Sequence, residues 1–210
     1  IMAARENRPQ MKLVVIDPRR TATAASADLH LALKPGTDGR LFDGLFAWLV
    51  NQGATDDEYI SRSTEGFAAA AGASVARSGD PGAVAAACGL ERESLTRFYQ
   101  WFAATERTVT VFSQGINQSV RGVDHASAIL QCHLACGRIG KPGAGPFSIT
   151  GQPNAMGGRE VGGLANQLAA HMELENEAHR ALVARFWGVD SVPAQAGLKA
   201  VDLFEAMEAG

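Results

Sequence analysis

The sequence predicts an α/β protein with a mainly parallel sheet and flanking helices. Three segments have the character of strands: residues 11–16 form a continuous apolar run, residues 29–33 alternate leucine with other side chains, and residues 108–112 are mostly β-branched. Segments with helical periodicity lie between them. Strands that alternate with helices favour parallel pairing, because each helix carries the chain back across the sheet.

The composition excludes several classes of protein. A chain of 210 residues corresponds to one or two domains, and its 46% hydrophobic and 20% charged residues exclude a disordered or fibrous protein. The net charge of -3, without a basic cluster, argues against a nucleic-acid partner, and no run of about 18 apolar residues could span a membrane. Three cysteines, an odd number, disfavour a disulfide framework and suit a reducing compartment.

The first half of the chain is expected to hold most of the helices. A helix over residues 39–52 places four large apolar side chains on one face and stops at Gly53. Residues 91–106 are equally amphipathic, and their aromatic side chains are expected to face inward. Shorter helices are expected over residues 20–27, after the Thr-Asp-Asp-Glu capping pattern at 55–58, and on either side of Asp80-Pro81-Gly82 within 66–89.

In the second half, a helix predicted over residues 124–137 presents Ala126, Ile129, Leu130 and Leu134 at helical spacing. Further helices are expected near residues 164–174, 175–187 and 199–210. A helix with no strand after it is unusual at the end of an alternating chain. We therefore expect the chain to be a piece of a longer polypeptide.

Cys132 and Cys136 flank His133 on the predicted helix, four residues apart. A tetrahedral metal site needs two further ligands, and no other ligand is patterned nearby. Buried helical cysteines are therefore the better interpretation, for Cys88 as well as for this pair, and no metal-ligating residue is assigned.

The stretch from 140 to 163 combines many glycines with apolar, amide and arginine side chains, including Gln152 and Arg159. A stretch of this length without regular structure is uncommon inside a compact domain unless it is functional. Its composition is too apolar for a linker. We interpret it as backbone packed closely around a ligand.

Short loops follow the three predicted strands, at residues 17–21, 35–38 and 114–118. Ligands of parallel α/β sheets bind outside the carboxyl ends of the strands. The first loop offers two arginines, which bind phosphate through a fork of donors, and a carboxylate that can accept from ribose hydroxyls or a base edge. In the second loop, the carboxylate of Asp38 could accept from adjacent N–H donors of guanine, a pair that adenine lacks.

Simpler interpretations of these loops stay open. An Asp-Pro pair after a strand is typical of a turn, and Pro-Gly-Thr-Asp before a helix is typical of an N-cap. The sequence also lacks the patterns G-x-G-x-x-G and G-x-x-x-x-G-K-[ST], which disfavours NAD, FAD and ATP as ligands.

Three longer segments carry a resemblance to a known family. They are VVIDPRRTATAASADLHLALKPGTDGRLFDGL, then FSQGINQSVRGVDHASAILQCHLACGRIGKPGAGPFSITGQPNAMGGREVGGLA, and HRALVARFWG. Together they resemble the catalytic subunits of bacterial assimilatory nitrate reductases, within the molybdopterin oxidoreductase (dimethyl-sulfoxide-reductase) family. The resemblance extends from about Met11 onward and is weakest over residues 66–89.

This resemblance implies a molybdenum enzyme that reduces nitrate to nitrite, with the metal held by two molybdopterin guanine dinucleotides. It implies that the loop after the first strand lines the ribose and phosphates of one dinucleotide, the next loop takes its guanine end, the third approaches the pterin and the metal, and two residues of the glycine-rich stretch face the substrate. In that order, the implied residues are Asp17, Pro18, Arg19, Arg20 and Thr21; Gly36, Thr37 and Asp38; Gln114, Gly115, Asn117 and Gln118; and the catalytic candidates Gln152 and Arg159.

The resemblance also implies a division of the chain. Residues 1–111 would be part of a Rossmann-like α/β domain that binds molybdopterin guanine dinucleotide, and residues 112–210 part of the adjoining α/β domain that binds the pterin and forms the substrate funnel. A [4Fe–4S] cluster and the side chain that ligates molybdenum would lie in a missing N-terminal part. The piece alone is therefore expected to be inactive, whereas the full enzyme would be cytoplasmic and receive electrons from a donor protein or subunit.

Two alternatives remain at this point. The chain could be a stand-alone guanine-nucleotide or cofactor-binding module without redox activity, or part of a family relative that acts on formate or another small substrate. Cysteine-rich sequence upstream would favour the nitrate reductase over the binding module.

Overall fold

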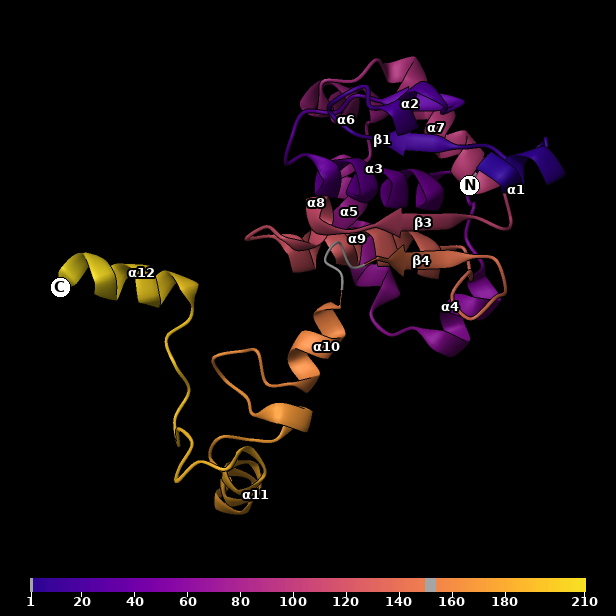
Figure 1. The fold of residues 1–210 in the computed structure, drawn as a ribbon. Helices are drawn as coiled ribbons and strands as arrows, with labels where there is room; N and C mark the ends of the chain where they lie inside the picture. Colours follow the sequence, from indigo (N-terminus) through magenta and orange to yellow (C-terminus); the bar gives the residue numbers. More distant parts are fainter. Residues whose placement is uncertain (1, 150–153) are drawn as a thin grey trace. The chain divides into compact units, whose positions relative to one another are not determined.

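The computed structural model describes residues 2–149 and 154–210 (Figure 1). The chain forms two compact units, Ile1–Ile149 and Thr150–Gly210. The contacts divide the chain after Ile149 because the last strand of the first unit pairs with a strand 36 residues earlier, from Val109 to Gly145. The domain boundary predicted between residues 111 and 112 concerns cofactor-binding domains and stays a prediction.

The strands of the first unit form two parallel pairs. β1 (Val14–Ile16) pairs with β2 (Leu29–Leu31), and β3 (Val109–Phe112) pairs with β4 (Gly145–Ser148). The predicted parallel α/β class is confirmed, but among the described residues the strands lie in two two-stranded sheets instead of one. Figure 1 shows β1, β3 and β4 running in the same direction, so their carboxyl ends face the same side of this unit.

β4 lies inside the stretch from 140 to 163, for which no regular structure was expected. The sequence Gly-Pro-Phe-Ser has little strand character, and Pro146 cannot donate to a ladder. A proline is tolerated at the edge of a sheet, and β4 has a partner on one side only among the described residues. The same stretch also contains the helix α10 (Ala155–Glu160).

The core of the first unit is built around α3 (Asp38–Asn51), the helix predicted over residues 39–52. Its buried side chains include Leu41, Phe42, Leu45 and Phe46, and they join Leu29 and Leu31 of β2 in one hydrophobic cluster. The helices that pack against α3 are α5 (Phe67–Ser78), α6 (Pro81–Cys88), α7 (Arg92–Ala104) and α9 (Gly122–Ala135).

Local capping explains where the shorter helices begin. Asp80 accepts from the N–H of Gly82 at the start of α6, so the two helices predicted within 66–89 are confirmed. Asp56, rather than Thr55, caps α4 (Asp57–Ser63) by accepting from the N–H of Tyr59 at 2.9 Å. The remaining short helices of this unit are α1 (Met2–Asn7), α2 (Ala22–Ala25) and α8 (Gln114–Asn117).

α9 buries only part of the face that its apolar spacing predicts, with Ile129 in the core and Ala126 packed against it. Leu130, predicted among the apolar positions, is 38% exposed, whereas His125, Cys132 and His133 are buried. The small side chains on the buried face let α9 approach α3 closely, and the Cys132 thiol lies 3.2 Å from the Phe42 carbonyl oxygen. The expectation of buried cysteines is confirmed for Cys88 and Cys132, and Cys136 is half-buried.

The second unit has a small core of Leu168, Leu174 and Val183. The helices predicted over 175–187 and 199–210 are confirmed as α11 (Glu177–Trp187) and α12 (Ala200–Ala209). The helix predicted near 164–174 is wrong, because only the 3-10 turn η1 (Ala169–His171) forms there. Ala170 and His171 have positive φ angles of 54° and 58°, which no right-handed helix accommodates.

No helix in the described part of the chain is long and apolar enough to cross a membrane.

A close contact at Gly44 supports a stability prediction. A Cβ at Gly44 would lie 2.6 Å from the Tyr99 hydroxyl oxygen and 2.9 Å from both methyl groups of Val84. Overpacking should outweigh the higher helix propensity of alanine, so Gly44→Ala should lower the free energy of unfolding by about 1–2 kcal/mol in urea titrations. Gly72 in α5 has open space around it, and Gly72→Ala should instead raise stability by about 0.5–1 kcal/mol. A loss of similar size for both variants would contradict the packing argument.

Candidate cofactor-binding site

The loop after β1 is held in place by its own polar groups. The Asp17 carboxylate accepts from the backbone N–H of Arg19 at 2.7 Å, and the Asp17 carbonyl accepts from the His30 ring at 2.8 Å. Thr21 caps α2 by accepting from the N–H of Ala24 at 3.2 Å. The side chains of Asp17 and Thr21 therefore shape the loop, as the turn interpretation predicts.

The remaining residues of this loop, Pro18, Arg19 and Arg20, are exposed. Neither guanidinium forms an ion pair with another residue of the described chain. Two unpaired arginines at the carboxyl end of a parallel strand can bind phosphate oxygens without first breaking an internal contact.

The loop after β2 leads directly into α3 without a side-chain cap. Gly36 has a φ of 81°, a conformation that favours glycine. Thr37 occupies the N-cap position, but its hydroxyl donates to the Lys34 carbonyl at 2.6 Å and does not cap the helix. The first intrahelical bond runs from Leu41 N–H to the Thr37 carbonyl at 3.0 Å. The first N–H groups of α3 therefore point out of the helix, where the macrodipole is positive.

Asp38 is the first residue of α3, and the N-cap position within Pro-Gly-Thr-Asp belongs to Thr37, whose side chain does not cap the helix. Its side chain is half-buried and makes no ion pair or hydrogen bond to another side chain in residues 2–149 and 154–210. Burial raises the pKa of Asp38, opposed by a hydrogen bond from its own backbone N–H and by the neighbouring His125 ring. A half-buried carboxylate with no hydrogen bond or ion pair to another side chain is suited to accept hydrogen bonds from a ligand.

The segment after β3 is a helical turn, α8, where a loop was expected. Ile116 is buried and anchors this turn, and the residues predicted to approach the pterin, Gln114, Gly115, Asn117 and Gln118, are all exposed. The Asn117 amide donates to the Ser148 hydroxyl at 3.2 Å, which ties α8 to the carboxyl end of β4. The structure thus presents three amide side chains at the carboxyl ends of the β3–β4 pair.

The two predicted catalytic residues belong to the second unit. Arg159 lies on α10 and is exposed, and its carbonyl accepts from the Gln167 amide at 2.7 Å. Gln152 lies outside the described residues.

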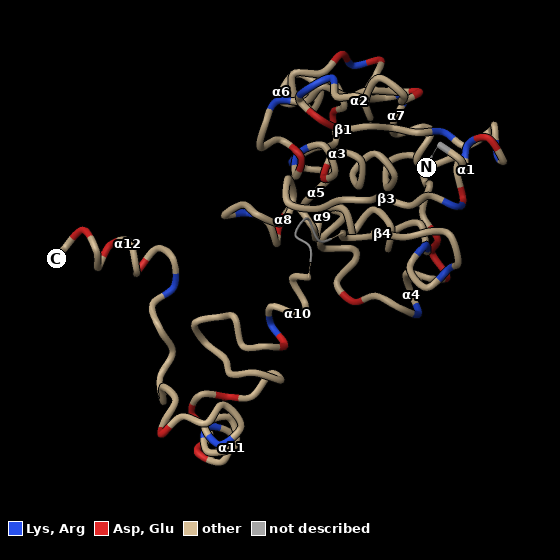
Figure 2. The backbone as a smooth tube through the Cα atoms, viewed as in Figure 1, with Lys and Arg blue, Asp and Glu red and all other residues tan. Residues whose placement is uncertain are grey.

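Charged side chains of both signs are distributed over the first unit. Figure 2 shows lysine and arginine interspersed with aspartate and glutamate along the first unit, without a continuous basic stripe over the described residues. Nucleic-acid-binding surfaces typically show such a stripe.

Sequence reasoning missed one residue at the start of α3. His125 on α9 packs against Gly39, 86 positions earlier in the chain, and its ring influences Asp38. No pattern in the sequence pairs these two positions, because the contact depends on which face α9 turns toward α3.

A parallel α/β unit with free arginines and an uncapped helix start at its strand ends is typical of proteins that bind nucleotide cofactors. The family model for molybdopterin oxidoreductase matches residues 1–208. The chain therefore belongs to the molybdopterin oxidoreductase family.

The similar proteins agree with this assignment. The chain is 50% identical over 207 residues to a nitrate reductase of Klebsiella oxytoca, covering 99% of the chain and 23% of that protein. It is 34% identical to the assimilatory nitrate reductase catalytic subunit of Bacillus subtilis, covering 94% of the chain and 28% of that protein. The chain is also similar to the structure of acetylene hydratase from Pelobacter acetylenicus, with a TM-score of 0.56 and 28% sequence identity. The superposition covers 63% of the present chain and 18% of the acetylene hydratase chain. The chain thus spans about a quarter of the length of these curated relatives.

Proposed function

We propose that the chain is part of the catalytic subunit of a nitrate reductase that reduces nitrate to nitrite. The observation that carries this proposal is the 50% identity to a nitrate reductase over 99% of the chain. The name of the Bacillus subtilis relative supports an assimilatory role. A cytoplasmic location and an electron-donor protein or subunit are further parts of the proposal.

The first unit fits the guanine dinucleotide form of the molybdopterin cofactor. The carboxylate of Asp38 can accept from N1–H and the 2-amino group of guanine, and the free N–H groups of α3 add donors beside it. Gly36 and Thr37 form the turn that leaves this helix start open. Arg19 and Arg20 can bind phosphates at the neighbouring strand end. One such dinucleotide is proposed for this unit, and a second one would complete the bis-dinucleotide molybdenum cofactor.

The bound molybdenum cofactor would supply oxygen-atom transfer to or from the substrate. The chain's own contribution is to hold and orient it. Gln114, Gly115, Asn117 and Gln118 would face the pterin with exposed amide groups, and Gln152 and Arg159 would face the substrate. A guanidinium there would attract an oxyanion such as nitrate. The molybdenum ligand and a [4Fe–4S] cluster are proposed for the rest of the polypeptide.

Base specificity tests the proposed role of Asp38. The 210-residue chain is expected to bind GMP about ten-fold or more tightly than AMP in isothermal titration calorimetry, because two hydrogen bonds to one base edge contribute about 1–3 kcal/mol. Asp38→Ala should remove this preference. Asp57 is the first residue of α4, as Asp38 is of α3, and Asp57→Ala should preserve the preference. Equal affinity of the wild-type chain for GMP and AMP would contradict the role.

The activity is tested on the full-length subunit. Nitrate should support the oxidation of reduced viologen, and formate should not be oxidised. Activity with formate and not with nitrate would instead indicate a family relative with another substrate. A full-length polypeptide that binds guanine nucleotides but is isolated without molybdenum and without either activity would favour the stand-alone binding module.

A further inference from the structure

His125 lies at the first turn of α9 with its ring against the first turn of α3. A Cβ added to Gly39 would lie 2.7 Å from Cδ2 and 3.2 Å from Nε2 of His125. The Cδ2–Nε2 edge of the ring therefore faces the uncapped start of α3. Only glycine at position 39 leaves room for the ring in this place.

The ring is buried but has no hydrogen-bond partner. His125 is 8% exposed, and its Nδ1 is fully buried without a partner. In the described part of the chain, no side chain or backbone group bonds to Nε2 either. Nδ1 is completely buried and Nε2 is not. Because completely buried N–H groups without a partner are rare, the favoured tautomer carries its proton on Nε2. A hydrogen-bond donor then faces the start of α3.

The other buried histidine of α9 shows what a structural role looks like. His133 is fully buried, and its Nε2 shares a hydrogen bond of 2.7 Å with the Thr110 hydroxyl. Its ring also packs edge-on against Phe102, with 5.2 Å between the ring centroids. Nδ1 is buried without a partner in both histidines, but His125 also lacks a bond at Nε2 among the described residues. A buried histidine without a hydrogen bond, beside a carboxylate that bonds to no other side chain, is better explained by a ligand that contacts both.

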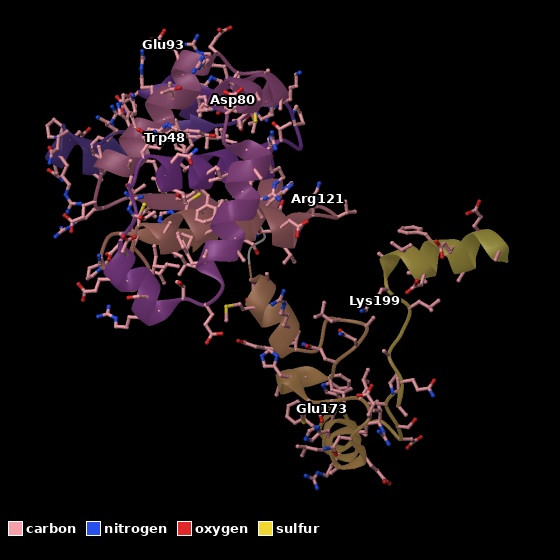
Figure 3. The ribbon with its side chains drawn as sticks, turned by 180° about the vertical axis from the view of Figure 1, so that it is seen from behind. Trp48, Asp80, Glu93, Arg121, Glu173 and Lys199 are labelled. Carbon is pink, nitrogen blue, oxygen red and sulfur yellow. The ribbon has the colours of Figure 1, made fainter. Side chains whose placement is uncertain are left out.

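The charged residues at the start of α9 pair with each other and not with His125. Arg121 lies at the N-terminal end of α9 and pairs with Asp124 at 3.4 Å, and both side chains are exposed (Figure 3). His125 and Asp38 are thus left to face a ligand at the helix start. A ring N–H donor next to a carboxylate matches a molecular edge that offers two donors and one acceptor side by side.

Guanine has such an edge, with N1–H and the 2-amino group as donors and O6 as the acceptor. We propose that His125 is a specificity-determining residue of this site, whose Nε2–H donates to O6 of the guanine that Asp38 binds. This inference rests on the proposed function of the first unit and adds a second residue to its base recognition.

Three nucleotides and three variants test the inference. GMP and IMP both carry O6, IMP lacks the 2-amino group, and AMP has a donor in place of O6. His125→Leu should weaken binding of GMP and of IMP to the 210-residue chain about five-fold each and leave AMP unchanged, because one neutral hydrogen bond is lost. His125→Gln, which restores a donor, should recover most of the affinity. His171→Leu, at an exposed position of the second unit, should change none of the three.

A second measurement is independent of how well the leucine variant folds. In the wild-type chain with 15N-labelled histidine, millimolar GMP should shift the ring nitrogen resonances of His125 and leave those of the buried His133 in place. Weaker binding of AMP together with GMP and IMP in His125→Leu, without recovery in His125→Gln, would show a merely structural role and overturn the inference.

The outcomes separate this inference from the proposed function. A wild-type preference for GMP over AMP that His125→Leu preserves overturns the role of His125 and leaves the guanine site standing. Equal binding of GMP and AMP by the wild-type chain, or binding of neither, overturns both.

Discussion

Acidification from about pH 7 to about pH 4 is expected to lower the free energy of unfolding by up to about 3 kcal/mol through protonation of His133 alone. The size follows because each tenfold change in proton affinity between the folded and unfolded chain corresponds to about 1.4 kcal/mol. Burial, together with the nearby charge of Arg138, lowers the pKa of His133 from 6.5 to about 4. Arg138 is itself buried, donates to the carbonyls of Phe102 and Thr105, and stacks on the Phe102 ring. A second positive charge beside it is therefore unfavourable.

The direction of this effect follows from proton uptake. The unfolded chain binds a proton at His133 as the pH falls through about 6.5, whereas the folded chain does so only near pH 4. The stabilisation is therefore complete above about pH 6.5 and is lost progressively between that value and about 4. Urea titrations across this range measure it. His133→Leu should flatten the dependence in this window, and an unchanged slope in that variant would contradict the assignment.

Asp43→Ala is expected to lower the free energy of unfolding by about 2–4 kcal/mol. Asp43 is buried on α3 and accepts hydrogen bonds from Ser74, Ser78 and, through two nitrogens at 2.8 and 2.6 Å, Arg77. Burial alone would raise the pKa of Asp43, but these hydrogen bonds outweigh it and lower the pKa. Removal of the carboxylate leaves two buried hydroxyl groups without this acceptor and breaks the ion pair.

The control for this variant is an exposed ion pair. Glu93 pairs with Arg97 at 2.7 Å on the surface of α7, where Figure 3 shows Glu93 at the periphery of the unit. Glu93→Ala should change stability very little, because exposed pairs contribute little in water. Urea titration of both variants compares them. Equal effects in the two variants would mean that burial of the Asp43 network contributes nothing.

Local pattern predicted much of the fold. Apolar runs and helical periodicity located β1, β2, β3 and α3, and Asp80-Pro81-Gly82 marked the break between α5 and α6. Two features that the sequence did not predict, β4 and the buried face of α9, depend on contacts between segments far apart in the chain. β4 forms because β3 offers it a ladder, although its own sequence contains a glycine and a proline. The face that α9 buries depends on the close approach of α3, which small side chains permit and an apolar pattern does not reveal.

The candidate site was likewise predictable in part. The loops at strand ends were predictable, because the position of ligands in parallel α/β proteins follows from topology. The sequence did not show which side chains of these loops are bonded within the loop and which are free to bind a ligand. Asp17 and Thr21 are engaged in turns, whereas Arg19 and Arg20 are free, and all lie in the same five residues. His125 could be found only after α9 was placed on α3.

α3 is shared between the core and the candidate site. Its first turn carries Asp38 and Gly39, and the turns that follow are buried among the helices of the unit. A ligand bound at that first turn would be released whenever the unit unfolds, so binding and folding are thermodynamically linked. The freedom of α3 to vary in sequence is small, because each change must satisfy both packing and recognition. The exposed loop with Arg19 and Arg20 is where ligand affinity can evolve at the least risk to the fold.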